Sequence, residues 1–423
     1  MKQFLILTAD AGFGHRTAAK AIATALQETH GPECAVQIVN PMEDRRTPSI
    51  LRNSQSDYDK LVRDMPRLYK FGFDASDASV PSRMVEGALT VMLFEVMDDL
   101  VRQYQPDVIV LTYPIYQAPL KAVYMVRSHY IPTITVVTDL VTPHRLWFHE
   151  VSDLCLVPTP QARDLALDAG LLGHQVQISG IPVSTSLSRE RRPAAAIRAE
   201  LGWRPDLTTV LAVGSKRVGR LYDVLRALNH SGLPLQLAVV AGGDDALYHQ
   251  LQETDWHAVT HLYNFVTHMP TLLHAADCVM CKAGGMIVSE SLAGGLPLLL
   301  VDVLPGQETG NAAYVVEGGA GEQVESALAA QETLCHWLDR GGTVLAERAS
   351  RARSLGRPWA AYEVAEHAWV IAERASAIEH AHQPQGRRKL IQFLERRGIT
   401  WKGLSAVTPP REEGLARGVH RQT

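Results

Sequence analysis

The sequence predicts an α/β protein made of two Rossmann-like domains, each a doubly wound parallel sheet, that face each other across a cleft. Short apolar runs of strand length alternate with longer helical patterns in both halves of the chain. The alternation is interrupted once, by the polar stretch GIPVSTSLSRERRP at residues 180–193. The 423 residues also suffice for two domains of ordinary size.

The first half, residues 1–180, is expected to form an amino-terminal domain. Its apolar runs predict strands and its longer patterns predict helices, in the alternating order of a parallel sheet. The strands are expected at residues 3–8, 35–39, 107–112, 133–138 and 154–157, and the helices at 15–29, 83–104, 117–128 and 160–169.

The second half, residues 181–357, repeats the pattern, and a helix is expected at 358–380. Residues 384–423 mix basic and apolar side chains, and we expect a partly disordered tail there. This tail is either solvated with one short helix or an anchor on anionic lipid. The strands of the second half are expected at residues 208–213, 235–241, 259–262, 277–281 and 298–302.

The composition is that of a folded soluble protein, with 46% hydrophobic and 20% charged residues. The net charge of −4 argues against a general nucleic-acid binder. The apolar run at the start is too short for a signal peptide and reads as the first strand, so we expect a cytoplasmic protein. Cys278 and Cys281 form a CxxC without a second pair for zinc, which favours buried structural thiols.

The segment 281–321 carries the strongest functional signal. Gly284 and Gly285 follow a predicted strand and open a helix, which continues through Met286 to Glu290. Glycines at a helix start let bare amides approach a phosphate, and the helix dipole favours an anion there. The Glu290 carboxylate can accept hydrogen bonds from ribose hydroxyls.

A second apolar strand, at 297–302, ends in a polar loop containing Gly306, Gln307 and Glu308, with Asn311 beyond it. These side chains offer donors and acceptors suited to a sugar. Sites for a diphosphate, a ribose and a sugar in one strand–helix–strand unit predict an enzyme that uses a nucleotide sugar.

Three ordered blocks resemble those of a known family, the diacylglycerol glycosyltransferases of glycosyltransferase family 28. The stretch KAGGMIVSESLAGGLPLLLVDVLPGQETGNAAYVVEGGAG at 282–321 is similar to the family's donor-site signature. TADAGFGHRTAAKAI at 8–22 resembles its glycine-rich acceptor-domain loop, and TVVTDLVTPHRLWFH at 135–149, with GIPV at 180–183, is the third block. Ala283 and Phe13 depart from the family, which usually has Pro and Gly there.

The resemblance implies the GT-B architecture, in which the last helix commonly crosses back to the first domain. It also implies inverting transfer of a hexosyl group from a UDP-sugar, as substrate rather than cofactor, to a diacylglycerol-type lipid. The acceptor could instead be polyisoprenoid-linked or soluble, or the chain could be a silent nucleotide-sugar-binding protein. No convincing metal motif is present, because Asp244 and Asp245 are adjacent rather than spaced as Asp-x-Asp.

His15 is the first candidate for the base that takes the acceptor's proton. It follows Gly12, Phe13 and Gly14 directly after the first strand, and histidine titrates near neutral pH. A helix-capping or packing histidine is the alternative. Asp139, at the end of another strand, is the second candidate, with loop capping as its alternative.

His144 and Trp147 follow Asp139 and are predicted to line the acceptor pocket, whereas Phe148 is assigned to the core. Gly12 and Gly14 could instead belong to a nicotinamide-binding fingerprint, but the GxGxxG spacing is absent.

Gly214 and Arg217 follow the first strand of the second domain and can approach the diphosphate, unless the loop is a plain turn. Phe265 and Val266 follow a strand at a place that in the GT-B fold often meets the base through backbone groups. Thr267 could in addition or instead cap a helix that begins at His268.

Residues 45–95 mix aromatic and basic side chains, which suits either the surface of an anionic membrane or a plain amphipathic helix. The position of this segment matches the lipid-facing insertion of the family, so we expect peripheral membrane association.

Overall fold

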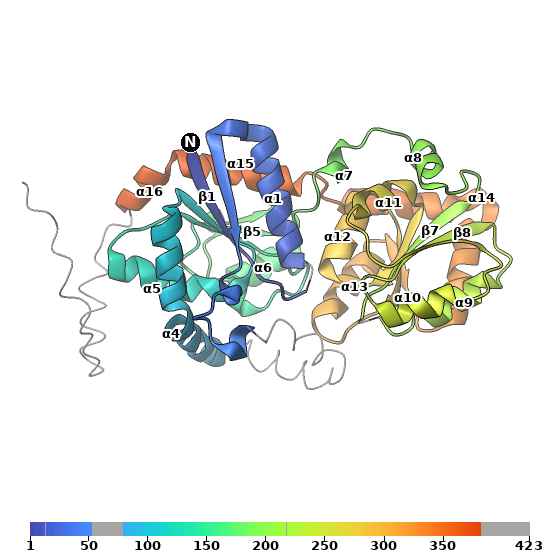
Figure 1. The fold of residues 1–423 in the computed structure, drawn as a ribbon, viewed down its shortest axis with the longest axis horizontal. Helices are drawn as coiled ribbons and strands as arrows, with labels where there is room; N and C mark the ends of the chain where they lie inside the picture. Colours follow the sequence, from blue (N-terminus) through green and yellow to red (C-terminus); the bar gives the residue numbers. More distant parts are fainter. Residues whose placement is uncertain (13, 53–78, 217, 382–423) are drawn as a thin grey trace, which may run out of the picture.

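The computed structural model describes residues 1–12, 14–52, 79–216 and 218–381. Two six-stranded sheets, one from each half of the chain, lie side by side with helices around them (Figure 1). Every strand pair in both sheets is parallel. None of the helices in the described ranges is long and apolar enough to cross a membrane.

The amino-terminal sheet has the strand order β2-β1-β3-β4-β5-β6. Its central strands are buried along their whole length, as expected when helices cover both faces of a parallel sheet. The strands are β1 (Lys2–Leu7), β2 (Cys34–Val39), β3 (Val108–Leu111), β4 (Thr133–Val136), β5 (Leu154–Val157) and β6 (Val176–Ile178).

Alternate residues of β1 point to opposite faces of this sheet. Phe4 and Ile6 pack with α1 (Gly14–His30) and α15 (Ala360–Glu373). Leu5 and Leu7 pack in a separate cluster with residues of the helices on the other face, α4 (Ser79–Tyr104) and α5 (Gln117–Arg127). A further helix, α6 (Pro160–Asp168), follows β5.

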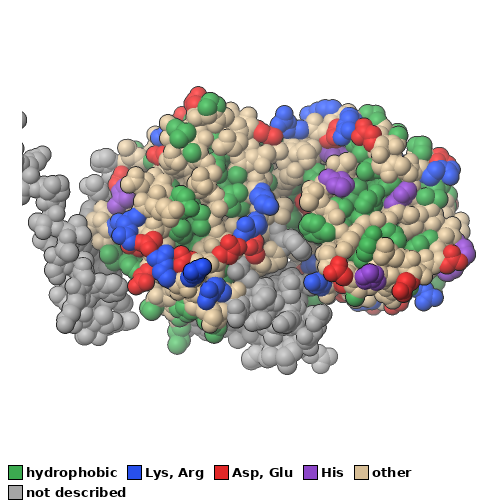
Figure 2. Space-filling view, in the orientation of Figure 1, with side chains coloured by type: hydrophobic (Ala, Val, Ile, Leu, Met, Phe, Trp, Pro, Cys, Tyr) green, Lys and Arg blue, Asp and Glu red, His purple; other side chains and the backbone are tan. Residues whose placement is uncertain are grey.

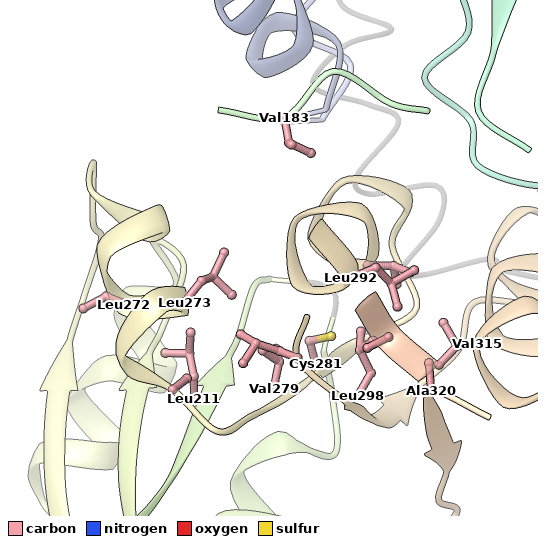
Figure 3. Close-up of a cluster of buried hydrophobic side chains, with 14 of the residues drawn as sticks. Val183, Leu211, Leu272, Leu273, Val279, Cys281, Leu292, Leu298, Val315 and Ala320 are labelled. Atoms are coloured by element: carbon pink, nitrogen blue, oxygen red, sulfur yellow. The ribbon is translucent and has the colours of Figure 1, made fainter. Parts of the chain in front are cut away.

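The carboxyl-terminal sheet has the order β12-β11-β10-β7-β8-β9. Figure 3 shows part of its core, in which Leu211, Val279 and Leu298 from three strands lie beneath Leu273 and Leu292 from helices. The strands are β7 (Thr208–Val213), β8 (Leu235–Val240), β9 (Val259–Tyr263), β10 (Cys278–Lys282), β11 (Leu298–Asp302) and β12 (Gly321–Gln323). The helices are α9 (Leu221–Asn229), α10 (Asp245–Gln252), α11 (Met269–Ala275), α12 (Gly285–Ala293), α13 (Gln307–Glu317) and α14 (Ala327–Leu355).

Two connections join the halves. The first carries α7 (Ser186–Arg189) and α8 (Ala194–Leu201), and the second leads from α14 to α15 and α16 (Ala375–Ala381). They pass very close to each other, because a Cβ at Gly180 would lie 2.5 Å from the Cβ of Arg357. Gly180 also has a φ of +86°, so glycine is required there for two reasons.

The fold agrees with the predicted strands to within one or two residues, and the returning helix lies on the amino-terminal sheet (Figure 1). This helix is broken at Arg374, which separates α15 from α16. Cys278 and Cys281 are buried, as predicted.

Two local predictions are wrong, and two short strands were missed. Gln307 and Glu308 do not form a loop but begin α13, because Gly306 takes a φ of +100° and the helix starts directly after it. Thr267 does not cap α11; the residue before that helix is His268, whose side chain makes no capping hydrogen bond. The short strands β6 and β12 were not predicted.

Candidate active site

The carboxyl ends of the two sheets meet at the start of α12. A Cβ on Gly285 would lie 3.5 Å from the carbonyl oxygen of Thr138, in the loop after β4. A Cβ on Gly14 would lie 3.8 Å from the Cβ of Met286. The glycine pair of the second domain and the glycine loop of the first therefore lie on opposite sides of one narrow interface, where α/β folds gather their ligands.

The loop before α1 is held in one shape by its backbone and its charges. Gly12 has a φ of +81°, which favours glycine. Arg16 donates hydrogen bonds to Asp10 at 2.7 Å and to Glu43 at 3.0 Å, so the first turn of α1 is tied to the ends of β1 and β2. Phe13 lies outside the described residues.

His15 is half-buried in this interface. Its Nδ1 is 2.6 Å from Oγ1 of Thr138, and the edge of its ring meets Tyr113 with 4.8 Å between ring centroids. Burial lowers the pKa of His15, while the nearby Asp139 charge and a hydrogen bond with the Thr112 backbone act in the opposite direction. The net shift keeps the imidazole neutral near pH 7, which is the state that a base requires.

Asp139 is oriented by Trp147, whose indole Nε1 donates a hydrogen bond of 2.6 Å to its carboxylate. The Trp147 ring is almost fully buried and lies 6.1 Å from the His15 ring. Trp147 is thus a core residue that fixes the second base candidate, and its contact with an acceptor stays a prediction.

His144 is also buried, and its Nδ1 accepts a hydrogen bond of 3.1 Å from the Leu146 amide. This bond caps a short 3-10 helix, Arg145–Trp147. Phe148 belongs to the same hydrophobic cluster as Trp147, which confirms its assignment to the core. The predicted role of His144 in acceptor binding is not tested by these contacts.

On the predicted donor side, the first amides of α12 have no partner among the described residues. The Val288 amide is bonded to the Gly284 carbonyl, and the amides that precede it in the first turn have no partner within the helix. Glu290 on the same helix is only 8% exposed, and burial raises its pKa to about 7. Within the described part of the chain, its carboxylate makes no hydrogen bond or ion pair. The carboxylate oxygens are therefore available to accept hydrogen bonds from a ligand.

Glu308 is held at both oxygens. One forms an ion pair with Lys282, at the end of β10, and the other accepts a hydrogen bond of 3.2 Å from the Leu304 amide. Asn311 donates a 2.9 Å hydrogen bond to the Ala283 carbonyl and so fixes the loop between β10 and α12. The side chain of Gln307 lies outside the described residues. Contacts of these residues with a sugar stay predictions.

The loops after β7, β8 and β9 form the outer part of the donor side. Gly214 and Gly242 pass so closely that a Cβ on Gly242 would lie 2.1 Å from the Gly214 carbonyl oxygen. Phe265 is 58% exposed, whereas Val266 packs against the core beneath it. An exposed aromatic ring at this edge of the sheet suits stacking on a nucleotide base. Arg217 lies outside the described residues.

Asp244 and Asp245 are engaged within the protein. Asp244 accepts a hydrogen bond from the Leu247 amide and caps α10, and Asp245 accepts one from Asn264. No three His, Cys, Asp or Glu side chains in the described ranges are grouped so that they could hold a metal ion.

Sequence reasoning missed Thr138, Tyr113 and Lys282. Lys282 is the last residue of a strand, and the other two lie two residues beyond the end of a strand. Asp139 was selected because ligand groups gather at the carboxyl ends of parallel strands, and the same rule could have selected these three residues. The sequence does not show which of these residues contact each other, because residues in contact can be far apart along the chain. His15 and Thr138, for example, are 123 positions apart.

Comparison with known proteins identifies the family. Residues 15–183 match the monogalactosyldiacylglycerol (MGDG) synthase family, and residues 212–354 match the glycosyltransferase family 28 C-terminal domain. A probable monogalactosyldiacylglycerol synthase of Glycine max is 32% identical over 376 residues, which cover 86% of this chain and 70% of that protein. The monogalactosyldiacylglycerol synthase of Spinacia oleracea is also 32% identical, over 86% of this chain and 71% of its own length.

The fold has a counterpart among solved structures. The crystal structure of Acinetobacter baumannii MurG superposes with a TM-score of 0.55 at 16% identity, and the match covers 88% of this chain and all of that chain. The two facing parallel sheets are those of the GT-B fold. The chain therefore belongs to the monogalactosyldiacylglycerol synthase family, the hexosyltransferases of glycosyltransferase family 28.

Proposed function

We propose that this chain transfers a hexosyl group, with inversion and without a metal ion, from a UDP-sugar to a diacylglycerol-type lipid at a membrane surface. One observation carries the proposal: the start of α12 lies against the loop of Thr138, whose hydroxyl touches His15. A diphosphate on the α12 amides and a base on α1 would then flank the same reacting carbon.

The donor would lie along the second domain. Its diphosphate would meet the amides of Gly285 and Met286, where the helix dipole favours negative charge. Glu290 would accept hydrogen bonds from the ribose hydroxyls, which gives its buried carboxylate the partners that it lacks. Phe265 would stack on the uracil ring.

The reaction needs one proton transfer and one displacement. As the acceptor hydroxyl oxygen bonds to the anomeric carbon, its proton passes to the neutral His15 ring, with Asp139 as the reserve base. The bond between the anomeric carbon and the diphosphate oxygen breaks, and UDP leaves with the electron pair. Attack from the face opposite the leaving group inverts the anomeric centre, and the α12 amides stabilise the charge on the leaving diphosphate.

The described surface next to residues 53–78 supports membrane contact. Ile50, Met84 and Val91 are large apolar side chains exposed on either side of that segment, and Met84 and Val91 are two turns apart on one face of α4. Arg45 and Arg52 are exposed nearby in the sequence. Figure 2 shows hydrophobic side chains at the lower left, where Figure 1 places α4, with charged side chains of both signs above them. Such mixing suits a headgroup-level surface.

The decisive experiment is a transfer assay with vesicles that contain diacylglycerol. UDP-galactose and UDP-glucose are supplied separately, with and without EDTA, and the anomeric configuration of the product is read by NMR. We expect a β-linked glycolipid from an α-linked donor, formed in the presence of EDTA. Transfer only to a soluble or polyisoprenoid acceptor would reject the lipid assignment. UDP binding without any transfer would indicate a silent binder, and loss in EDTA that magnesium or manganese restores would reveal a metal site.

A further inference from the structure

A buried ion pair lies beside the start of α12, and neither partner has a role in the mechanism above. Lys282 closes β10 and Glu308 stands in the first turn of α13. Their side chains are 18% and 7% exposed. A Cβ on Gly284 would lie 2.7 Å from the Lys282 Nζ and 3.5 Å from a Glu308 oxygen. The pair therefore touches the backbone where the donor's diphosphate is expected.

The Lys282 ammonium has more hydrogen-bond donors than the described protein uses. It carries three N–H groups, and among the described residues Glu308 is its single acceptor. Glu308, in contrast, is satisfied at both oxygens, by Lys282 and by the Leu304 amide at 3.2 Å. Glu308 thus holds the ammonium in place and leaves two of its donors for another group.

The neighbourhood indicates an anion as that group. The unpaired amides of α12 begin at Gly285, one residue from the glycine that the ammonium touches. Glu290, further along the same helix, is a largely buried carboxylate without a partner in the described chain, so a second polar group on this helix is available to a ligand.

We propose that Lys282 binds the diphosphate of the nucleotide-sugar donor directly, with Glu308 as the anchor that aims it. This inference rests on the proposed function, since it assigns a further ligand within the same donor site. The ammonium is a compact point charge suited to phosphate. Placed at the helix start, it supplies positive charge that the dipole alone provides only in part.

An indirect role for Lys282 would fit the same contacts, and the two roles predict different results. In the indirect role, Lys282 only neutralises Glu308, whose carboxylate would otherwise repel the diphosphate. Removing both charges would then restore nucleotide affinity. If the ammonium binds the diphosphate, removing both charges leaves the affinity low.

The experiment measures UDP and uridine binding by calorimetry in the wild type, Lys282→Met, and the double variant Lys282→Met/Glu308→Gln. The double variant keeps a neutral pair of similar size, so it remains informative if the single variant, with an unpaired buried carboxylate, fails to fold. We expect both variants to bind UDP about tenfold to a hundredfold more weakly, the loss typical of a hydrogen bond to a charged group. Uridine, which lacks phosphate, should bind as it does to the wild type.

Wild-type UDP affinity in the folded double variant would overturn the proposal and leave Lys282 as a counter-charge. An equal loss of UDP and uridine affinity in that variant would also overturn it, because the change would not concern phosphate. A wild-type protein that binds neither compound would instead overturn the proposed function, and this inference with it.

Discussion

The Glu290 carboxylate shows how a single buried side chain makes folding stability depend on pH. It is buried on α12, and burial raises its pKa from 4.5 to about 7. The unfolded chain ionises Glu290 near pH 4.5, while the folded chain keeps it protonated up to about pH 7. Folding stability attributable to this group is therefore intact below pH 4.5 and is lost as the pH rises through 7, by about 3 kcal/mol for the full shift.

We expect Glu290→Gln to unfold less readily than the wild type at pH 8 and equally at pH 4. The amide carries no charge to desolvate but still lacks a partner, so the gain at pH 8 should be roughly 1 to 3 kcal/mol. Denaturant unfolding at the two pH values measures it, and calorimetry should show weaker UDP binding. Glu317→Gln, an exposed change on α13, is the control. If Glu290→Gln changed the free energy of unfolding by the same amount at pH 4 and at pH 8, the burial argument would be contradicted.

His15 makes a prediction about rate. Because burial lowers its pKa below 6.5, the wild-type kcat should be level near pH 7 and fall on the acid side, below pH 6.5. His15→Ala should lower kcat by roughly two to four orders of magnitude and remove the acid limb, while UDP affinity stays near normal. A steady-state pH profile for both proteins tests this. If His15→Ala keeps its turnover and Asp139→Asn loses it, the base is Asp139.

At the scale of elements, the strands that could be predicted from the sequence are those with an apolar run of their own. Strands such as β7 and β11 are apolar runs and were placed correctly. β12 has no apolar run: it pairs with β11 through its backbone, and a Cβ on Gly321 would lie 2.1 Å from the Leu298 carbonyl oxygen. A strand of this kind forms because the neighbouring strand offers hydrogen bonds to its backbone. Its own residues therefore have no apolar pattern from which it could be predicted.

The same limit applies to the candidate site. His15, Asp139 and Glu290 could be selected because each occupies a recognisable place after a strand or at a helix start. The pairings of the site could not be predicted, because the Thr138 contact with His15 and the Lys282 contact with Glu308 are tertiary contacts. Sequence position predicts where a side chain sits in the sheet but not which side chain from another element fixes it.

The packing of α15 on α1 makes an element-scale prediction. Ala361, Ala365 and Ala368 are fully buried against a helix that contributes Ala21 and Ala25, so the two helices approach closely. Ala365→Leu should destabilise the protein by about 1 to 3 kcal/mol through overpacking. Thermal unfolding measures the loss. Glu373→Ala, at the exposed end of α15, is the matched control and should have an effect within about 0.5 kcal/mol. Equal effects of the two changes would show that the contact is loose.

At the scale of the whole molecule, the two halves are joined by a shared core rather than by a linker alone. Leu140 and Val141 of the amino-terminal half pack in the same cluster as Val183 and Leu187 of the connection and Leu292 of α12. Any separation of the sheets must break this cluster or rotate about it. The start of α12 and the loop that contacts His15 are therefore already opposed in the folded chain.

Membrane association is the prediction that belongs to the whole molecule. If Ile50 and Val91 contact lipid, the double variant Ile50→Asp/Val91→Asp should bind anionic vesicles at least about tenfold more weakly, since each change puts a charge in place of an exposed apolar side chain that would enter the lipid. Binding of the wild type should fall as salt rises, because exposed basic residues are screened. Vesicle sedimentation measures both. Leu328→Asp, on the exposed surface of α14, is the control and should bind like the wild type. Unchanged binding by the double variant would place the membrane contact elsewhere.

The position of α15 has a consequence for the order in which the protein is made. The sheet of residues 2–178 is synthesised first, yet one of its faces is covered by residues 360–373. While the ribosome is still adding the second half, α1 covers that face only in part, whereas β7 to β12 and their helices can already pack on each other. Domains usually mature in the order of their translation. Here the half that is begun first is finished after the second half, and a nascent-chain protease experiment would find it partly open until α15 emerges.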